Sequence, residues 1–235
     1  MLSVRDKNKI SAKGSWFGSF ILFLYATTFS FAYIELDTGT GALILFGAVQ
    51  ITMILTSVIS GNQLHFSEWL GVIISFIGFS YLILPSINTP STSGLLLMTT
   101  AGISWAFYTL NGRKSTNPLS DTSYNFLKTI PFVIILAAIT IKNTHYSNQG
   151  ILLAILSGGI ASGIGYAIWY NVLRDLSITQ AAVVQLLVPV IATIGGILFV
   201  SEAITIRLVV SAVMILGGIL MVLLSRQSFM HPSNF

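Results

Sequence analysis

Cysteine and charge are what this sequence lacks. Among 235 residues there is no cysteine, and charged residues make up only 8% of the chain. The missing cysteine excludes disulfide bonds, thiolate metal sites and thiol redox chemistry. A soluble domain is usually about 25% charged, so this chain has too few charges to cover a globular fold in water. The hydrophobic share of 54% therefore indicates a protein that is solvated by lipid.

Enzymatic and nucleotide-driven functions find no support in the residues. The histidines, His65, His145 and His231, fall in separate loops and in the C-terminal tail, where they cannot form a metal cluster or a triad. The sequence contains no Gly-Lys-Ser/Thr loop that would cradle phosphates. The net charge of +4 is too scattered for a nucleic-acid surface. We therefore expect no enzyme activity, cofactor, bound metal or nucleic-acid partner.

Long apolar runs fill most of the chain. A helix needs about 20 mainly apolar residues to cross a bilayer, and eight stretches meet or approach this length. The first follows a polar N-terminus and has no cleavage site after it, so we expect it to be retained. The sequence therefore predicts an all-α, polytopic membrane bundle of eight helices. The predicted spans are 15–33, 41–61, 69–87, 94–111, 124–141, 150–173, 178–200 and 204–224.

Basic residues are distributed unevenly over the predicted loops. If the N-terminus is cytoplasmic and the eight spans alternate, nine Lys and Arg residues face the cytoplasm, and only Lys142 and Arg207 face the other side. Cytoplasmic loops of membrane proteins carry an excess of Lys and Arg. We therefore expect both termini in the cytoplasm, with the protein in the cell (plasma or inner) membrane.

The chain also contains a weak internal repeat. A shift of 140 positions aligns the second and third spans with the seventh and eighth, so that Ile51 meets Ile191 and Gly78 meets Gly218. Paired spans are five apart, an odd number, so they cross the membrane in opposite directions. Such inverted-topology repeats place a binding site near the midplane. We expect an incomplete first repeat of three spans (1–93), a second of five (94–226) and a cytoplasmic tail (227–235).

Several blocks of the sequence are more specific than hydrophobicity alone. They are Phe29-Ser-Phe-Ala-Tyr33, 38–50, Ala101-Gly-Ile-Ser-Trp-Ala-Phe-Tyr108 with Gly112-Arg113, Gly165-Tyr-Ala-Ile-Trp-Tyr170, 181–189, Glu202 and Gly217-Gly218. These blocks resemble EamA-type members of the drug/metabolite transporter superfamily. The resemblance implies a secondary transporter of ten helices in two inverted five-helix repeats, with both ends cytoplasmic. Compared with that pattern, the chain lacks the first two helices, and it has Asn62 where the first repeat often carries Glu.

Polar and aromatic side chains within the spans are the candidate substrate contacts. Amides supply hydrogen bonds in an apolar site, and aromatic faces hold apolar or cationic groups. Pro189 removes a backbone hydrogen bond and frees a carbonyl near Gln185. Helix packing and an interfacial aromatic belt are the alternative interpretation. The candidates for the substrate path are Tyr25, Gln50, Trp105, Tyr108, Tyr166, Trp169 and Gln185.

Two further features lie in the later spans. Glu202 ends a long apolar stretch, where it either binds a coupling proton or, as we favour, lies at the outer interface near Arg207. In the sixth span, Gly159, Gly163 and Ala167 recur every four residues, a small-residue stripe that predicts close approach of another helix.

The favoured function is a secondary transporter that moves a small metabolite or drug-like molecule by alternating access. The resemblance implies export as its direction. Its partners are the lipid bilayer and that small-molecule substrate, and a monomer or a homodimer fits this function. Two alternatives stay open: a truncated, inactive relic, which the two absent helices suggest, and an accessory or structural membrane subunit that needs a different partner.

The inverted repeat makes a direct topological prediction. Because the loop at 62–67 aligns with 201–206 in the paired repeat, reporter tags inserted in these two loops will lie on opposite sides of the membrane. Fusions of a reporter that is active on one side only will measure this. Tags that report the same side would exclude the inverted repeat.

Overall fold

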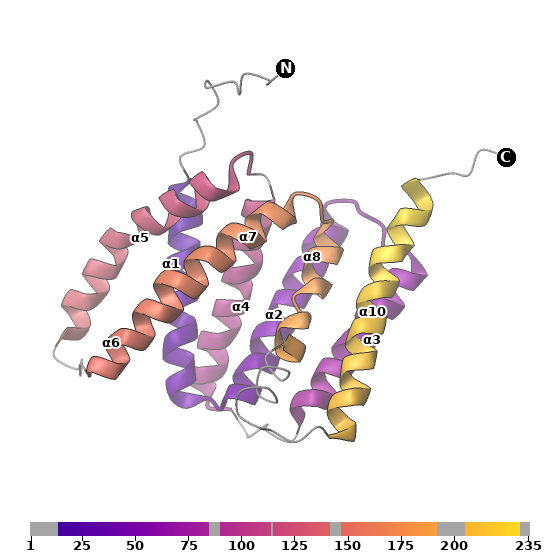
Figure 1. Ribbon diagram of the computed structural model, residues 1–235, viewed down its shortest axis with the longest axis horizontal. Helices are drawn as coiled ribbons and strands as arrows, with labels where there is room; N and C mark the ends of the chain where they lie inside the picture. Colours follow the sequence, from indigo (N-terminus) through magenta and orange to yellow (C-terminus); the bar gives the residue numbers. More distant parts are fainter. Residues whose placement is uncertain (1–13, 85–89, 114, 142–146, 192–204, 231–235) are drawn as a thin grey trace, which may run out of the picture. The chain divides into compact units, whose positions relative to one another are not determined.

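The computed structural model describes residues 14–84, 90–113, 115–141, 147–191 and 205–230. Within these ranges the regular secondary structure is entirely helical (Figure 1). The helices are α1 (Trp16–Glu35), α2 (Thr38–Ile59), α3 (Phe66–Ile83), α4 (Thr92–Gly112), α5 (Pro118–Thr140), α6 (Asn148–Ala154), the π-helix η3 (Ile155–Ser162), α7 (Gly163–Leu173), α8 (Ile178–Val184) and α10 (Ile206–Met230).

Six of these segments are long and apolar enough to cross a membrane: 16–35, 38–59, 66–83, 118–140, 148–173 and 206–225. They confirm six of the eight predicted spans, with the fifth beginning six residues earlier than expected, at Pro118. The fourth predicted span corresponds to α4, which is long enough to cross a membrane but is not among the six segments that are also apolar enough. The seventh corresponds to the apolar helical stretch 178–191, and its predicted remainder lies outside the described residues. The protein is a polytopic helical membrane bundle.

Local sequence explains where several helices begin. Pro118 occupies the first turn of α5, where its missing N–H costs nothing, and the Asn117 side chain accepts a hydrogen bond from the Ser120 N–H. At the start of α8, Ser177 and Gln180 form a reciprocal capping box. These side chains satisfy the N–H groups that the first turn of any helix leaves without partners.

The chain forms two compact units, and α1 and α4 each contribute to both. Unit 1 comprises residues 1–25 and 107–175, and unit 2 comprises 26–106 and 176–235. The division therefore falls inside α1, after Tyr25, and inside α4, after Ala106.

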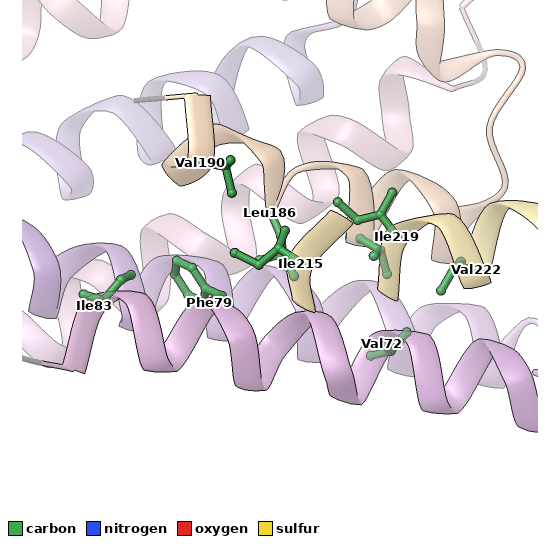
Figure 2. Close-up of a cluster of buried hydrophobic side chains, with 9 residues drawn as sticks. Val72, Phe79, Ile83, Leu186, Val190, Ile215, Ile219 and Val222 are labelled. Carbon is green, nitrogen blue, oxygen red and sulfur yellow. The ribbon is translucent and has the colours of Figure 1, made fainter. Parts of the chain in front are cut away.

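Unit 2 is built around an apolar core that α3, α8 and α10 supply (Figure 2). Phe79 and Ile215 are fully buried, and Phe46 of α2 packs edge-to-face against Phe79 with ring centroids 5.5 Å apart. The buried members of this core are Val72, Phe79, Ile83, Val183, Leu186, Val190, Ile215, Ile219 and Val222.

Small residues let α3 and α10 pack closely, side by side (Figure 1). A Cβ at Gly71 would lie 2.6 Å from the Gly218 carbonyl oxygen, and one at Gly78 would lie 2.6 Å from the Met214 Cβ. Ser67 pairs with Ser225 at 2.7 Å between hydroxyl oxygens. Partner numbers fall as α3 advances, so the two helices are antiparallel. The sequence predicts that the third and eighth spans run in opposite directions, and the antiparallel α3 and α10 do so.

The small-residue stripe of the sixth span does not behave as predicted. A Cβ at Gly159 or Gly163 would meet nothing within 4 Å, so no helix of the described chain approaches there. The stripe lies partly in η3, a π-helical segment that widens the helix locally. The close contact of α3 with α10 is made instead at Gly71, Gly78 and Gly218.

The adjacent glycines of α10 provide a test of the tight contact. Gly218→Ala places a methyl group against the Gly71 carbonyl and Ser75, so we expect it to lower the free energy of unfolding by about 1–3 kcal/mol. Gly217→Ala is the matched control, because its Cβ meets nothing within 4 Å. Thermal unfolding in detergent, followed by loss of the monodisperse peak, will measure both. Equal effects of the two substitutions would contradict the packing role.

Candidate functional site in the membrane interior

The helix that begins at Ile178 is broken at Gln185. The regular α-helix ends at Val184, residues 185–186 form a turn, and helical geometry resumes for 187–191. Pro189 has no N–H to donate to the Gln185 carbonyl, and this carbonyl instead accepts from Val188 N–H at 3.1 Å. The helix is irregular next to Pro189, but the prediction of a free carbonyl near Gln185 is wrong, because the Val188 N–H takes the place of the missing donor. Irregular backbone at membrane depth occurs where it is buried in protein or lines a cavity.

At this break, both polar atoms of the Gln185 side-chain amide form hydrogen bonds. Its Nε2 donates to the Ala181 carbonyl oxygen at 2.9 Å and to the Met53 sulfur at 3.4 Å. Its Oε1 accepts a hydrogen bond from the indole N–H of Trp105, which comes from α4. The amide therefore joins three helices of unit 2 at a buried position.

Gln50, on α2, meets the same part of α8 but is not fully paired. Its Nε2 donates to the Ala182 carbonyl oxygen at 3.3 Å. Its Oε1 is buried and has no hydrogen-bond partner among the described residues, although the whole side chain is only 4% exposed. A buried acceptor without a donor costs about 1–3 kcal/mol. This oxygen is therefore an available acceptor for the N–H or O–H of a bound molecule.

Unit 1 contains a second cluster, made of tyrosines. Tyr108 is fully buried, and its ring centroid lies 4.9 Å from that of Tyr170 and 6.1 Å from that of Tyr166. The Tyr170 hydroxyl donates to the Tyr108 carbonyl oxygen at 3.1 Å. Tyr166 also packs against Phe126 of α5, with ring centroids 5.8 Å apart, and lies beside Tyr25 of α1. The tyrosines thus tie α4, α5 and α7 together.

The structure groups the predicted path residues into two sets. Gln50, Trp105 and Gln185 meet in unit 2, while Tyr25, Tyr108 and Tyr166 meet in unit 1. Trp169 is half-buried, and its indole N–H has no partner within the described residues. Glu202 lies outside the described residues, whereas Arg207 lies over the Tyr81 ring, 5.7 Å from its centroid.

Sequence reasoning missed two members of these clusters. Tyr170 lies four residues after Tyr166, on the same helix face, so helical spacing alone would have included it. Met53 lies three residues after Gln50 and presents its sulfur to Gln185, a contact for which the sequence carries no signal.

A third polar group lies where α5 meets the start of α1. Asp121 Oδ1 accepts from the Gly14 N–H at 3.0 Å, and Asn125 Oδ1 accepts from the Ser15 N–H at 3.0 Å. Lys128 Nζ donates to the Gly14 carbonyl oxygen at 3.1 Å and lies 5.8 Å from the Trp16 ring centroid. Asp121 precedes the predicted span at 124–141, and the structure places it in the first turn of α5.

Carboxylates do not gather into a metal site in the part of the chain that the structure describes. Glu68 is buried in the first turn of α3, where its side chain accepts from the His65 N–H at 2.9 Å. Groups of three or more His, Asp or Glu side chains that would hold a metal ion are absent from these residues. The chemistry on offer in both clusters is therefore binding through amides and aromatic rings.

Comparison with known proteins identifies the class of this helical membrane bundle. The sequence pattern of the EamA-like transporter family matches residues 92–224, which is more than half of the chain. The chain belongs to the EamA-like transporter family.

Relatives extend this similarity over most of the chain. An uncharacterized protein of Pseudomonas aeruginosa is 41% identical over 201 residues, which cover 86% of this chain and 70% of that protein. The uncharacterized transporter YyaM of Bacillus subtilis is 30% identical over 66% of this chain and 54% of its own length. An uncharacterized transporter of Archaeoglobus fulgidus is 25% identical over 83% of this chain and 71% of its own length.

A solved crystal structure shares the fold. Its TM-score with this chain is 0.73 at 16% sequence identity, and the match covers 89% of this chain and 76% of the other. At this identity the likeness concerns the helical architecture alone.

The tyrosine cluster yields a prediction for Tyr170. Tyr170→Phe keeps the ring stacking but removes the hydrogen bond to the Tyr108 carbonyl, so the free energy of unfolding will fall by about 0.5–1.5 kcal/mol. Tyr124→Phe, at an exposed position of α5, is the matched control and will leave stability unchanged. Thermal unfolding in detergent will measure the difference, and a neutral Tyr170→Phe would show that this bond adds nothing.

Proposed function

We propose that this protein is a secondary transporter that moves a small metabolite or drug-like molecule across the cell membrane by alternating access, with export as the favoured direction. Membership of the EamA-like transporter family supports transport. The substrate, the direction and the cytoplasmic location of both termini belong to the proposal. The basic residues of the predicted cytoplasmic loops support that orientation.

The observation that carries the proposal is the buried Gln50 Oε1, which has no hydrogen-bond partner among the described residues and lies on a side chain that bonds to the broken helix of Gln185. Transporters of this kind bind substrate at discontinuous helices near the midplane. A protein that needed only stability would pair this oxygen or replace the amide with an apolar side chain, because an unpaired buried acceptor is costly. A substrate N–H or O–H group that donates to Gln50 Oε1 removes that cost while it is bound.

The other path residues have supporting roles in this proposal. Trp105, hydrogen-bonded to Gln185, orients the amide and offers an aromatic face to the substrate. Tyr25, Tyr108, Tyr166 and Trp169 are proposed to contact substrate in unit 1, where aromatic faces suit apolar or cationic groups. Coupling to a proton at Glu202 remains a part of the proposal that rests on the sequence alone.

Gln50→Met separates a transport role from a structural one. Methionine keeps the length and volume of glutamine but has no amide, so the variant loses both the unpaired acceptor and the Nε2 bond to the Ala182 carbonyl. The two effects oppose each other, and we expect the free energy of unfolding to change by no more than about 1–3 kcal/mol. Transport will fall at least tenfold, because about 1.4 kcal/mol of substrate binding is lost with one hydrogen bond to the amide.

Comparative metabolite profiling will provide the measurement. Cells that express the wild type, Gln50→Met or Gln63→Leu are compared for metabolites that accumulate in the medium, with protein amounts matched in the membrane fraction. Gln63, an exposed residue after α2, is the control and will behave as the wild type. If no metabolite distinguishes wild-type cells from empty-vector cells, or if Gln50→Met exports as the wild type does, the proposed function is wrong.

A further inference from the structure

A cavity opens where α2 ends and α3 begins. Its volume is about 530 Å³, within the range of about 300–1,000 Å³ that small-molecule sites occupy. It lies wholly in unit 2 and is separate from the candidate substrate path, because Val58 follows Gln50 by eight residues, or about 12 Å along the axis of α2. The residues that line the cavity are Val58, Gly61, Asn62, Gln63, Leu64 and Trp69.

The linker between the two helices is fixed at both of its ends. Gly61 has a left-handed φ of 81°, which glycine adopts without strain. Its N–H and that of Asn62 donate to carbonyl oxygens in the last turn of α2, at 3.0 Å and 3.1 Å, which is the Schellman arrangement. At the start of α3, His65 and Glu68 form a reciprocal capping box. The cavity is therefore formed before a ligand binds.

Uncharged amides form the polar part of the cavity. Neither the Asn62 nor the Gln63 side chain has a hydrogen-bond partner among the described residues, and each amide offers both N–H donors and a carbonyl acceptor. Charged side chains are absent from the described lining, whereas sites for anionic lipids and phosphates are built from Lys and Arg. A head group that carries one positive and one negative charge, and so no net charge, matches this lining.

The apolar part of the cavity continues along both helices. Since α2 and α3 are long and apolar enough to be membrane spans, the cavity at their ends lies at the level of the lipid head groups, where tryptophan is enriched. Trp69 is 42% exposed. On the membrane side of Val58 and Trp69, helical spacing places further exposed apolar side chains on the same helix faces. They are Leu55 and Ile51 on α2, and Ile73 and Ile77 on α3.

We propose that this cavity binds the head group of phosphatidylethanolamine, with the acyl chains of the lipid along the exposed faces of α2 and α3. The ethanolamine ammonium donates to the amide oxygens of Asn62 and Gln63 and lies against the ring of Trp69, whose face attracts cations. The lipid phosphate accepts hydrogen bonds from the amide N–H groups. A choline head group has no N–H to donate, and phosphatidylglycerol has no cation and brings a net negative charge.

Native mass spectrometry of the purified full chain in detergent will measure the binding. Phosphatidylethanolamine, phosphatidylcholine and phosphatidylglycerol with identical acyl chains are titrated separately, and the dissociation constants of the first bound lipid are compared. The wild type will bind phosphatidylethanolamine about tenfold more tightly than either of the others, because a hydrogen bond to a charged donor is worth about that factor. A ligand that binds the folded state stabilises it, so this lipid will also give the largest rise in unfolding temperature.

Two substitutions at one position separate recognition of the head group from simple contact with lipid. Asn62→Leu removes an amide, so the affinity for phosphatidylethanolamine will fall about tenfold, to that for phosphatidylcholine. Asn62→Lys supplies a cation, so the tightest ligand will change from phosphatidylethanolamine to phosphatidylglycerol. A residue that served only the folding of the linker would not exchange one head group for another.

Matched controls lie outside the cavity. Gln149 is an exposed amide in the first turn of α6, and neither Gln149→Leu nor Gln149→Lys will change the order of the three lipids. Trp69→Leu keeps both amides but removes the aromatic face. It will weaken binding of phosphatidylethanolamine and phosphatidylcholine alike, by about two- to fivefold.

The lipid site is wrong if the wild type shows no preference among the three lipids, if Asn62→Leu keeps the preference, or if Gln149→Leu removes it. Dimers that Asn62→Leu disrupts, without any lipid preference, would assign the cavity to a second copy of the chain instead. If the Asn62 variants do not fold, Trp69→Leu decides: weaker binding of both lipids supports the site, and unchanged binding excludes it.

This inference is independent of the proposed function. Lipid binding is measured on the purified chain, whereas export is measured in cells. Because the cavity is separate from Gln50, loss of an amide from the lipid site in Gln63→Leu will leave export unchanged.

Discussion

Pro189 cannot donate a hydrogen bond to the carbonyl of Gln185, and the interior of unit 2 is arranged around that missing bond. In a membrane, backbone groups must find partners within the protein, because lipid supplies none. The Gln185 carbonyl finds one by tightening the turn to Val188, and Gln50 reaches the Ala182 carbonyl at the same turn. The break therefore costs little and leaves two amide side chains at the place where α8 is irregular.

This arrangement explains why polar residues persist in so apolar a chain. Both polar atoms of the Gln185 amide form hydrogen bonds, to Trp105, to Met53 and within its own helix. These bonds hold the amide in one orientation and join the helices. Gln50 keeps one oxygen without a hydrogen-bond partner in the described part of the chain, which stability alone does not favour. Glutamine thus has two roles in unit 2, and only that of Gln50 points to a ligand.

Apolar and polar helix contacts are separated along the chain. The α3–α10 pair joins closely through glycines and serines, with an apolar core beside it. The two ends of α1 are held instead by side-chain hydrogen bonds, from Asp121 and Asn125 of α5 at one end and between Glu35 and Ser91 at the other.

Much of the fold could be predicted because hydropathy is a local property. Runs of apolar residues identified the spans, although the start of α5 at Pro118 lies six residues before the predicted one. Pro189 drew attention to the segment around Gln185, where the helix is irregular. The shift of 140 positions predicted opposite crossing of two spans, and the antiparallel α3–α10 pair agrees with it. The EamA-type resemblance rested on short blocks of sequence and was confirmed by the family match.

The sequence by itself determined that this chain belongs in a membrane, how it is divided into helices and to which family it belongs. Only the tertiary structure decided which polar groups meet. Asp121 looked like a loop residue yet holds the start of α1, and the glycine stripe of the sixth span has no partner in the described chain. The physical reason is that hydropathy and helix caps act within about one turn of the chain. Contacts between helices depend on how each is rotated and which neighbour it packs against, which no local pattern records.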